Sequence, residues 1–312
     1  MKISSKIPLT FNGFSLIDYL ATRFTYLERE IWKERILESR FIRNEKVLHE
    51  KSIIFHKDII VYDMPDIDEP EANFNYKIIK RTDNFLAIDK PFGLMVHKHG
   101  INFRNNLIYH LRELHEPPFP TADIVNRLDK NTSGIVLISL NKNALKELLR
   151  QFADRSVKKT YFAVVLGTPN PLYGEISVPI AKIMKNAENN NNNGRFCEVN
   201  LHDGKPCQTF YETIKSANGH SLVKLFPKTG RTHQLRIHLA HISVPIVGDT
   251  AYGLSMEEYI NFCKKNDIIP IETNRHLLHC ANLEFSLFGE KISVDSDLPE
   301  EFVKNRYLFS DF

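Results

Sequence analysis

The stretch that decides the fold reads Asn126-Arg127-Leu128-Asp129-Lys130-Asn131-Thr132-Ser133-Gly134, and it leads directly into the apolar run Ile135-Val136-Leu137-Ile138. An apolar run that follows turn-forming residues is typical of a buried strand. We therefore expect Asp129 to lie on a loop immediately before such a strand. Its carboxylate has two interpretations: it caps a turn through Thr132 and Ser133, or it is a functional group that a rigid scaffold presents on a loop.

A second long segment reads Pro227-Lys228-Thr229-Gly230-Arg231-Thr232-His233-Gln234-Leu235-Arg236-Ile237-His238-Leu239. It follows an apolar strand expected at 222–226. Thr232 is a residue type that caps helices, and the apolar spacing then predicts a helix whose inward face is Leu235, Leu239 and Ile242. Arg236 lies beside that face. A further helix is expected at 141–153, and Tyr161, which taken alone is an ordinary strand aromatic, follows it.

These segments resemble the signature motifs of RluA-type pseudouridine synthases, which isomerise uridine in RNA. The resemblance continues in residues 89–97, 158–163, 245–253 and 275–281, and it covers roughly 76–299. It implies an α+β catalytic domain with a largely antiparallel mixed sheet, packed helices and a central cleft. It also implies an isomerase that needs no cofactor and binds RNA, with ribosomal RNA favoured over transfer RNA.

The resemblance also assigns roles to residues. Asp129 would be the catalytic nucleophile, or the base that begins glycosidic elimination, and the two routes stay open. Arg236 would hold that carboxylate by paired charge-assisted hydrogen bonds. Tyr161 would lie beneath the target uracil, and Leu278 would pack against it.

Two arginines have less specific roles in this scheme. Arg127 would occupy the space that the flipped nucleotide leaves, or would hold its phosphate. Arg231, near the start of the predicted helix, is placed to bind phosphate, although a solvated turn residue is an equal alternative. The motif usually carries His where this chain has Asn126. Both side chains donate a hydrogen bond, but only His titrates near neutral pH.

The N-terminal part predicts a separate small α/β module at 1–63, followed by an acidic, proline-bearing linker at 64–75 and the catalytic domain at 76–312. Helices are expected at 16–24 and 32–38, and strands at 46–48 and 57–62. Their order resembles an S-four-like RNA-binding domain, although the glycines typical of that domain are absent. The residues that would face phosphate are Arg35, Arg40, Arg43 and Lys46.

Composition agrees with this interpretation without deciding it. The net charge is only +3, so whole-chain electrostatics permit an RNA partner without requiring one. No apolar stretch reaches the roughly 20 residues that cross a bilayer, and the start of the chain lacks the apolar core of a signal peptide, so we expect a cytoplasmic protein, and a monomer. The asparagine tract at 189–193 predicts a surface loop. The cysteines are expected to be free thiols; they are Cys197, Cys207, Cys263 and Cys280.

Other site chemistries fit the sequence less well. The spacing of His233, His238 and His241 does not give the i, i+4 pair of a helical zinc site. A glycosidase that uses two carboxylates would need a second acid, for which Asp249 is the obvious candidate. A nucleic-acid-binding protein without catalysis would not need Asp129, Tyr161 and Arg236 together.

Overall fold

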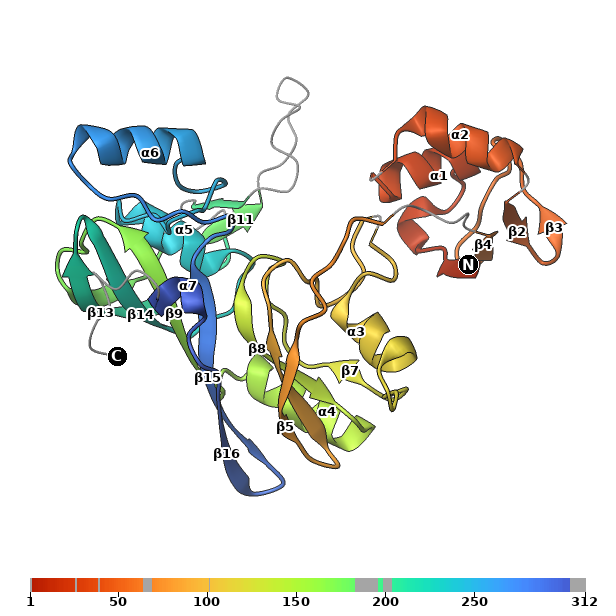
Figure 1. Ribbon diagram of the computed structural model, residues 1–312. Helices are drawn as coiled ribbons and strands as arrows, with labels where there is room; N and C mark the ends of the chain where they lie inside the picture. The colour runs from red at the N-terminus through yellow and green to blue at the C-terminus, as the bar shows by residue number, and fades with distance from the viewer. Residues whose placement is uncertain are drawn as a thin grey trace. The chain divides into compact units, whose positions relative to one another are not determined.

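The computed structural model describes residues 2–303 apart from 26, 39, 64–68, 101, 183–195 and 199–203 (Figure 1). Much of the predicted linker and the whole asparagine tract therefore lie outside the described residues. The chain forms two compact units: Met1–Glu71 with His97–Tyr109, and Ala72–Val96 with His110–Phe312. The segment His97–Tyr109 thus belongs to the first unit, although it falls inside the predicted catalytic range.

Among the described residues, the first unit combines two longer helices with a small antiparallel sheet. The helices are α1 (Leu16–Arg23) and α2 (Arg29–Leu37), and they lie where the sequence predicts them. Sheet order is β1-β4-β2-β3. The strands are β1 (Lys2–Lys6), β2 (Phe41–Arg43), β3 (Lys46–Val47) and β4 (Ile59–Asp63), with a short η1 turn at Leu9–Phe11.

The core of this unit forms where α1 and α2 bury their apolar faces. Leu16, Tyr19 and Leu20 of α1 are buried together with Trp32 of α2. Phe103, from the segment His97–Tyr109, packs against the same cluster. The short helix α3 (Leu107–Tyr109) ends that segment. Residues far apart in the sequence therefore contribute to one core.

The arginines predicted to face phosphate make contacts within the unit. Arg43 Nη1 lies 2.5 Å from Asp58 Oδ2, and Arg40 Nε lies 2.5 Å from Glu38 Oε2. Arg35 donates to the hydroxyl of Tyr62 at 3.1 Å. These pairings engage the guanidinium groups inside the module, so RNA would have to compete for them.

The second unit is built on one large sheet. Its main path is β10-β13-β14-β9-β15-β8-β6-β5, with β16 paired to β15 and β7 paired to β8. All recorded pairings are antiparallel except that of β15 with β8. The strands are β5 (Lys77–Arg81), β6 (Phe85–Lys90), β7 (Asp123–Ile124), β8 (Ser133–Ser139), β9 (Lys158–Leu166), β10 (Tyr173–Ile176), β13 (Thr209–Ala217), β14 (His220–Pro227), β15 (Leu278–Leu287) and β16 (Glu290–Asp295).

A separate two-stranded ribbon and five helical segments complete this unit. The ribbon pairs β11 (Ile180–Lys182) with β12 (Phe196–Glu198). The helical segments are η2 (His110–Leu114), α4 (Lys142–Ala153), α5 (Gln234–His241), α6 (Met256–Lys265) and α7 (Glu300–Val303). The fold is the predicted α+β arrangement with a largely antiparallel sheet. Among the described residues, no helix has the length and apolar character needed to cross a membrane.

The two principal helices lie where the sequence predicts them. Asn141 caps α4 by accepting a hydrogen bond from the Ala144 backbone, and α4 packs against β8 and β15 (Figure 1). The inward residues Leu235 and Leu239 of α5 are buried in a cluster with residues of β9 and β14. This packing fixes α5 on the sheet.

Strand β8 is the element that positions the loop of Asp129. All seven of its residues are buried, and it lies between β6 and β15. Gly134 pairs with Cys280 at a φ of 107°, and a Cβ at this position would collide with the Cys280 carbonyl oxygen. Only glycine therefore allows β8 and β15 to approach this closely.

Candidate active site

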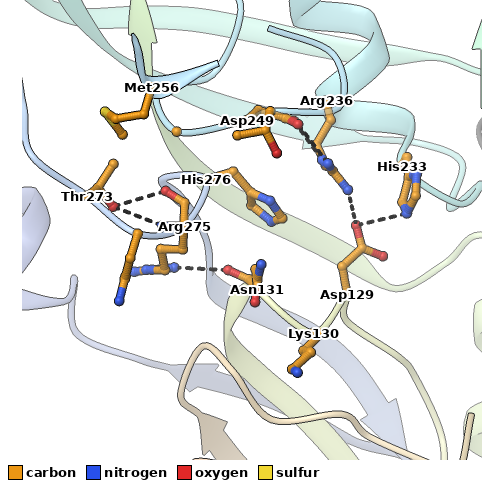
Figure 2. Close-up of a pocket in the computed structure, with 13 residues that line it drawn as sticks. Asp129, Lys130, Asn131, His233, Arg236, Asp249, Met256, Thr273, Arg275 and His276 are labelled. Atoms are coloured by element: carbon orange, nitrogen blue, oxygen red, sulfur yellow. Dashed lines mark hydrogen bonds and ion pairs between the residues drawn. The ribbon is translucent and has the colours of Figure 1, made fainter. Parts of the chain in front are cut away.

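A pocket of about 360 Å³ opens beside the loop that precedes β8 (Figure 2). It is formed entirely by the second unit. Its walls come from the turn before β8, the start of α5, the turn before α6 and the segment leading into β15. The lining residues are Asp129, Lys130, Asn131, His233, Arg236, Gly248, Asp249, Thr250, Met256, Thr273, Asn274, Arg275 and His276.

Asp129 lies on a tight turn that its own carbonyl closes by accepting from the Thr132 backbone at 3.1 Å. The hydroxyls of Thr132 and Ser133 are hydrogen-bonded to His276 and His279, so they are not partners of the Asp129 carboxylate. That side chain is instead 30% exposed and faces the pocket. The turn-capping interpretation of this carboxylate is therefore wrong.

Two basic side chains approach the same oxygen of Asp129. Arg236 Nη1 lies 3.3 Å from Oδ2, and His233 Nε2 lies 3.7 Å from it. Figure 2 shows both side chains reaching the carboxylate from one side. Among the described residues, no hydrogen-bond donor is recorded for the other oxygen, Oδ1. One oxygen is thus anchored while the other stays available.

The paired hydrogen bonds of Arg236 go to Asp249, which corrects the prediction that they hold Asp129. Arg236 Nε and Nη2 donate to the two oxygens of Asp249 at 2.6 and 2.7 Å. Only Nη1 remains for Asp129. The geometric reason is that Asp249, 13 residues along the chain, occupies the edge formed by Nε and Nη2, so Nη2 does not join Nη1 in a paired contact with Asp129.

Asp249 does not supply the free second acid of a glycosidase. It is 1% exposed, and it also accepts hydrogen bonds from the backbones of Ala251 and Tyr252. Burial alone raises the pKa of Asp249, but the hydrogen bonds and charge of Arg236 outweigh burial and lower its pKa overall. Asp249 is therefore an ionised structural partner.

The start of α5 differs from the sequence prediction in one detail. The capping position is His233 in the left-handed region at a φ of 59°, so Thr232 is not the cap. Gln234 instead accepts from the Arg231 backbone and from the Thr229 hydroxyl at 3.1 and 2.7 Å. This arrangement turns the ring of His233 toward Asp129.

The Asp129 loop is fixed by three residues for which the sequence predicts no role. Lys90 is fully buried and donates to three carbonyls, those of Pro91, Leu94 and Lys130. Burial, aided by the charge of Arg275, lowers the pKa of Lys90 to about 7. Arg275 donates to the Asn131 carbonyl at 3.3 Å. The bond of the third residue, His276, to the Thr132 hydroxyl measures 2.8 Å. All three lie in segments that carried the family resemblance.

Asn126 acts on the backbone of β8. Its amide donates to the Ile135 carbonyl at 3.3 Å and accepts from the Leu137 backbone at 2.7 Å. It therefore joins the start of the Asp129 loop to the strand that follows. One donor and one acceptor are sufficient for this role.

Known proteins resemble this chain in sequence and in fold. The family model described as RNA pseudouridylate synthase matches residues 84–241, half of the chain. The chain belongs to the RNA pseudouridine synthase family. Ribosomal large subunit pseudouridine synthase D of Borreliella burgdorferi is 31% identical over 81% of this chain and 80% of its own length. Synthase C of Buchnera aphidicola subsp. Baizongia pistaciae is 34% identical over 74% and 69%.

A solved structure supports the same assignment. The human RNA pseudouridylate synthase domain-containing protein 4 has a TM-score of 0.57 and 26% identity, and the match covers 73% of this chain and 91% of the human one. These relatives make the protein an RluA-type RNA pseudouridine synthase, an isomerase, as the sequence predicts.

The synthase does not bring all the predicted site residues into the pocket. Asp129 and Arg236 line it, whereas Tyr161 and Leu278 lie on the adjacent strands β9 and β15. Burial first, and then Cys280 and Asp129, raise the pKa of Tyr161, so its hydroxyl is protonated at neutral pH. Leu278 is buried. Tyr161 is thus electrostatically coupled to Asp129 without lining the same pocket.

The two remaining predicted site residues lie on the surface. Arg127 and Arg231 are both exposed, and neither lines the pocket. Arg127 lies near the start of the Asp129 loop, and Arg231 lies just after the end of β14.

The buried histidines of the synthase predict a pH-dependent stability. Burial, first among the causes, lowers the pKa of His276 to about 3 and that of His279 to about 4. The folded state then holds these rings neutral while the unfolded state protonates them below about 6.5. The free energy of unfolding therefore has its full value above that pH and decreases as the pH drops. At pH 5 each histidine lowers it by about 2 kcal/mol.

Urea unfolding at pH 7 and pH 5 tests this expectation. His276→Leu should remove about half of the loss, because it removes one of the two titrating rings. If the free energy of unfolding of the unmutated protein is equal at both pH values, these histidines do not govern the loss of stability in acid.

Proposed function

We propose that this synthase isomerises uridine in ribosomal RNA with Asp129 as the catalytic carboxylate. The observation that carries the proposal is the asymmetry of that carboxylate. Oδ2 is held by Arg236 at 3.3 Å, while Oδ1 has no donor among the described residues and the side chain is part-exposed to a pocket. A carboxylate that is fixed at one oxygen and open at the other suits nucleophilic or general-base chemistry.

The reaction rearranges one nucleotide without a net change in composition. The bond between uracil N1 and ribose C1′ breaks, the base turns over while it stays bound, and a bond forms between C5 and C1′. The proton on C5 leaves and N1 gains one. Asp129 starts this sequence either by attack or by removing a proton to begin elimination, and Arg236 keeps it oriented.

Tyr161 and Leu278 are proposed to hold the uracil between them. An aromatic ring stacks on a flipped base, and a phenol hydroxyl relays the proton that leaves C5 by accepting it while passing its own proton on. The raised pKa of Tyr161 supports a hydroxyl that holds its proton until the base arrives. Arg127 and Arg231 are proposed to bind phosphate beside the reacting nucleotide.

Ribosomal RNA is the proposed substrate because the two bacterial relatives described above are named as synthases of the large ribosomal subunit. We propose that the protein works in the cytoplasm as a monomer. The N-terminal unit is proposed to add RNA contacts of its own, a proposal supported by the two helices α1 and α2 that precede strands β3 and β4, as expected for an S-four-like module.

Mapping pseudouridines in total RNA from cells with and without this gene tests the substrate directly. The expected result is the loss of one or a few pseudouridines from large-subunit ribosomal RNA, and their return on incubation with purified protein. Loss of sites from transfer RNA alone would overturn the ribosomal assignment. An unchanged map, together with an inactive purified protein, would favour a binding role.

Substitutions at Tyr161 are expected to separate stacking from proton transfer. Tyr161→Phe should bind RNA normally but stall before product, because the ring remains and the hydroxyl is lost. Tyr161→Ala should in addition weaken RNA binding by about 1–3 kcal/mol. Binding isotherms and single-turnover rates on a uridine-containing stem-loop measure both effects.

Tyr211→Phe is the matched control, because its buried hydroxyl bonds to the Pro171 carbonyl away from the pocket. It should leave the rate unchanged. Equal loss of affinity in the Phe and Ala variants of Tyr161 would show that the ring is not the stacking surface.

A further inference from the structure

Arg236 is held more firmly by Asp249 than by Asp129. Its Nε and Nη2 bonds to Asp249 measure 2.6 and 2.7 Å, whereas its Nη1 lies 3.3 Å from Asp129. Arg236 and Asp249 are 8% and 1% exposed. Figure 2 shows Asp249 on the opposite side of the guanidinium from Asp129. The orientation of Arg236 is therefore set before any substrate is present.

A tyrosine supports the same guanidinium from a third direction. The ring of Tyr252 lies 5.0 Å from the guanidinium carbon of Arg236, within the range of a cation–π contact. The Tyr252 hydroxyl is 2.7 Å from His233 Nδ1. The other ring nitrogen of His233 faces Asp129 at 3.7 Å. One side chain thus contacts both basic neighbours of the carboxylate.

The backbone of this region is shaped to present both residues. Gly248 has a φ of 79°, and a Cβ there would collide with the Arg275 carbonyl oxygen. The turn that follows is closed by a bond from the Gly253 backbone to the Asp249 carbonyl at 2.8 Å. Asp249 and Tyr252 therefore leave one rigid turn and reach Arg236 together.

We propose that Asp249 and Tyr252 are positioning residues that act through Arg236 and His233, restricting the protein's contacts to Oδ2 of Asp129 so that Oδ1 is the oxygen that reacts. The proposal rests on the catalytic role proposed for Asp129. Without Asp249, Nη2 of Arg236 would join Nη1 in engaging both oxygens of Asp129. Such a paired contact would shield the reactive oxygen and slow the chemical step without weakening RNA binding.

The test measures kcat for pseudouridine formation and the Kd for RNA binding, in three variants. Asp249→Asn keeps the shape and the backbone contacts but presents an amide nitrogen to a donor of Arg236, so kcat should fall on the order of 100-fold with Kd within about twofold. Tyr252→Leu, which removes the ring, should lower kcat about tenfold. Tyr252→Phe keeps the ring and should cost about threefold or less.

A double-mutant cycle shows whether Asp249 acts through Arg236. In an Arg236→Ala background, Asp249→Asn should slow the reaction by no more than about twofold, since the group through which it acts is gone. A residue that only stabilises the fold would lower activity equally in both backgrounds. Tyr252→Leu in the same two backgrounds keeps the test decisive if Asp249→Asn folds poorly, because its tenfold loss should shrink when Arg236 is absent.

Ser139→Ala supplies the stability control. Its buried hydroxyl bonds to the Asn141 carbonyl at the far end of β8 from Asp129, so it should lower Tm and leave kcat unchanged. If Asp129→Asn is inactive but Asp249→Asn and Tyr252→Leu both keep the unmutated kcat, the positioning role is wrong and the catalytic one stands. An active Asp129→Asn would remove the proposed function itself.

Discussion

Asp129→Asn is expected to abolish isomerisation, lowering kcat on the order of 10⁴-fold or more. The amide matches the carboxylate in size but is a poor nucleophile and a poor base. Folding should be nearly unchanged, because the carboxylate is 30% exposed and, among the residues that the structure describes, its one hydrogen bond is the 3.3 Å contact to Arg236. The buried Arg236–Asp249 pair remains intact in the variant.

The measurement is pseudouridine formation under single turnover, with RNA affinity and Tm determined on the same preparation. Asp154→Asn is a suitable control, because Asp154 is an exposed carboxylate paired with Arg150 at the end of α4. It should behave as the unmutated protein does. Turnover of Asp129→Asn above a trace, after contamination is excluded by mass spectrometry, would move the catalytic role elsewhere.

Arg236→Lys is expected to lower kcat by about 100- to 1,000-fold, because an ammonium cannot reproduce the geometry of a guanidinium. Arg236 uses three nitrogens for two carboxylates at once. A lysine reaches one of them as a point charge, so either Asp249 or Asp129 loses its partner. Since Asp249 is buried, the variant should also lose about 2 kcal/mol of stability.

Arg150→Lys is the matched exchange on the surface, where Arg150 pairs with Glu147 and Asp154 on an exposed face of α4. Exposed pairs contribute little to stability, so this control should change neither rate nor Tm. Chemical denaturation and single-turnover kinetics of the two variants give the comparison. A near-normal rate for Arg236→Lys would place Arg236 outside the active site.

Local patterns were sufficient to predict several elements of the fold. The buried strand after Asp129 and the helix from Lys142 follow from apolar spacing, and burial in the structure reproduces that spacing. The proximity of Asp129 and Arg236 followed from the resemblance to a family. These features depend on residues close in sequence or on motifs whose relative placement is already known.

The partners of the site residues needed the tertiary structure. The pairing of Arg236 depends on which carboxylate, Asp129 or Asp249, meets its Nε and Nη2 donors. No rule of sequence spacing states that. Thr232 has the chemistry of a cap, but the left-handed backbone at His233 begins the helix one residue later. Lys90 looks like a surface lysine until three carbonyls are found around its ammonium.

The membership of His97–Tyr109 in the first unit constrains how this protein can be cut or recombined. The polypeptide passes from one unit to the other after Glu71, after Val96 and after Tyr109, so a single break does not release either one. A fragment that starts at residue 72 would leave Phe103 without the apolar partners it has in the full chain. Grafting this N-terminal unit onto another synthase therefore requires transfer of the internal segment as well. An exchange of such units between relatives needs two matched insertions instead of one fusion point.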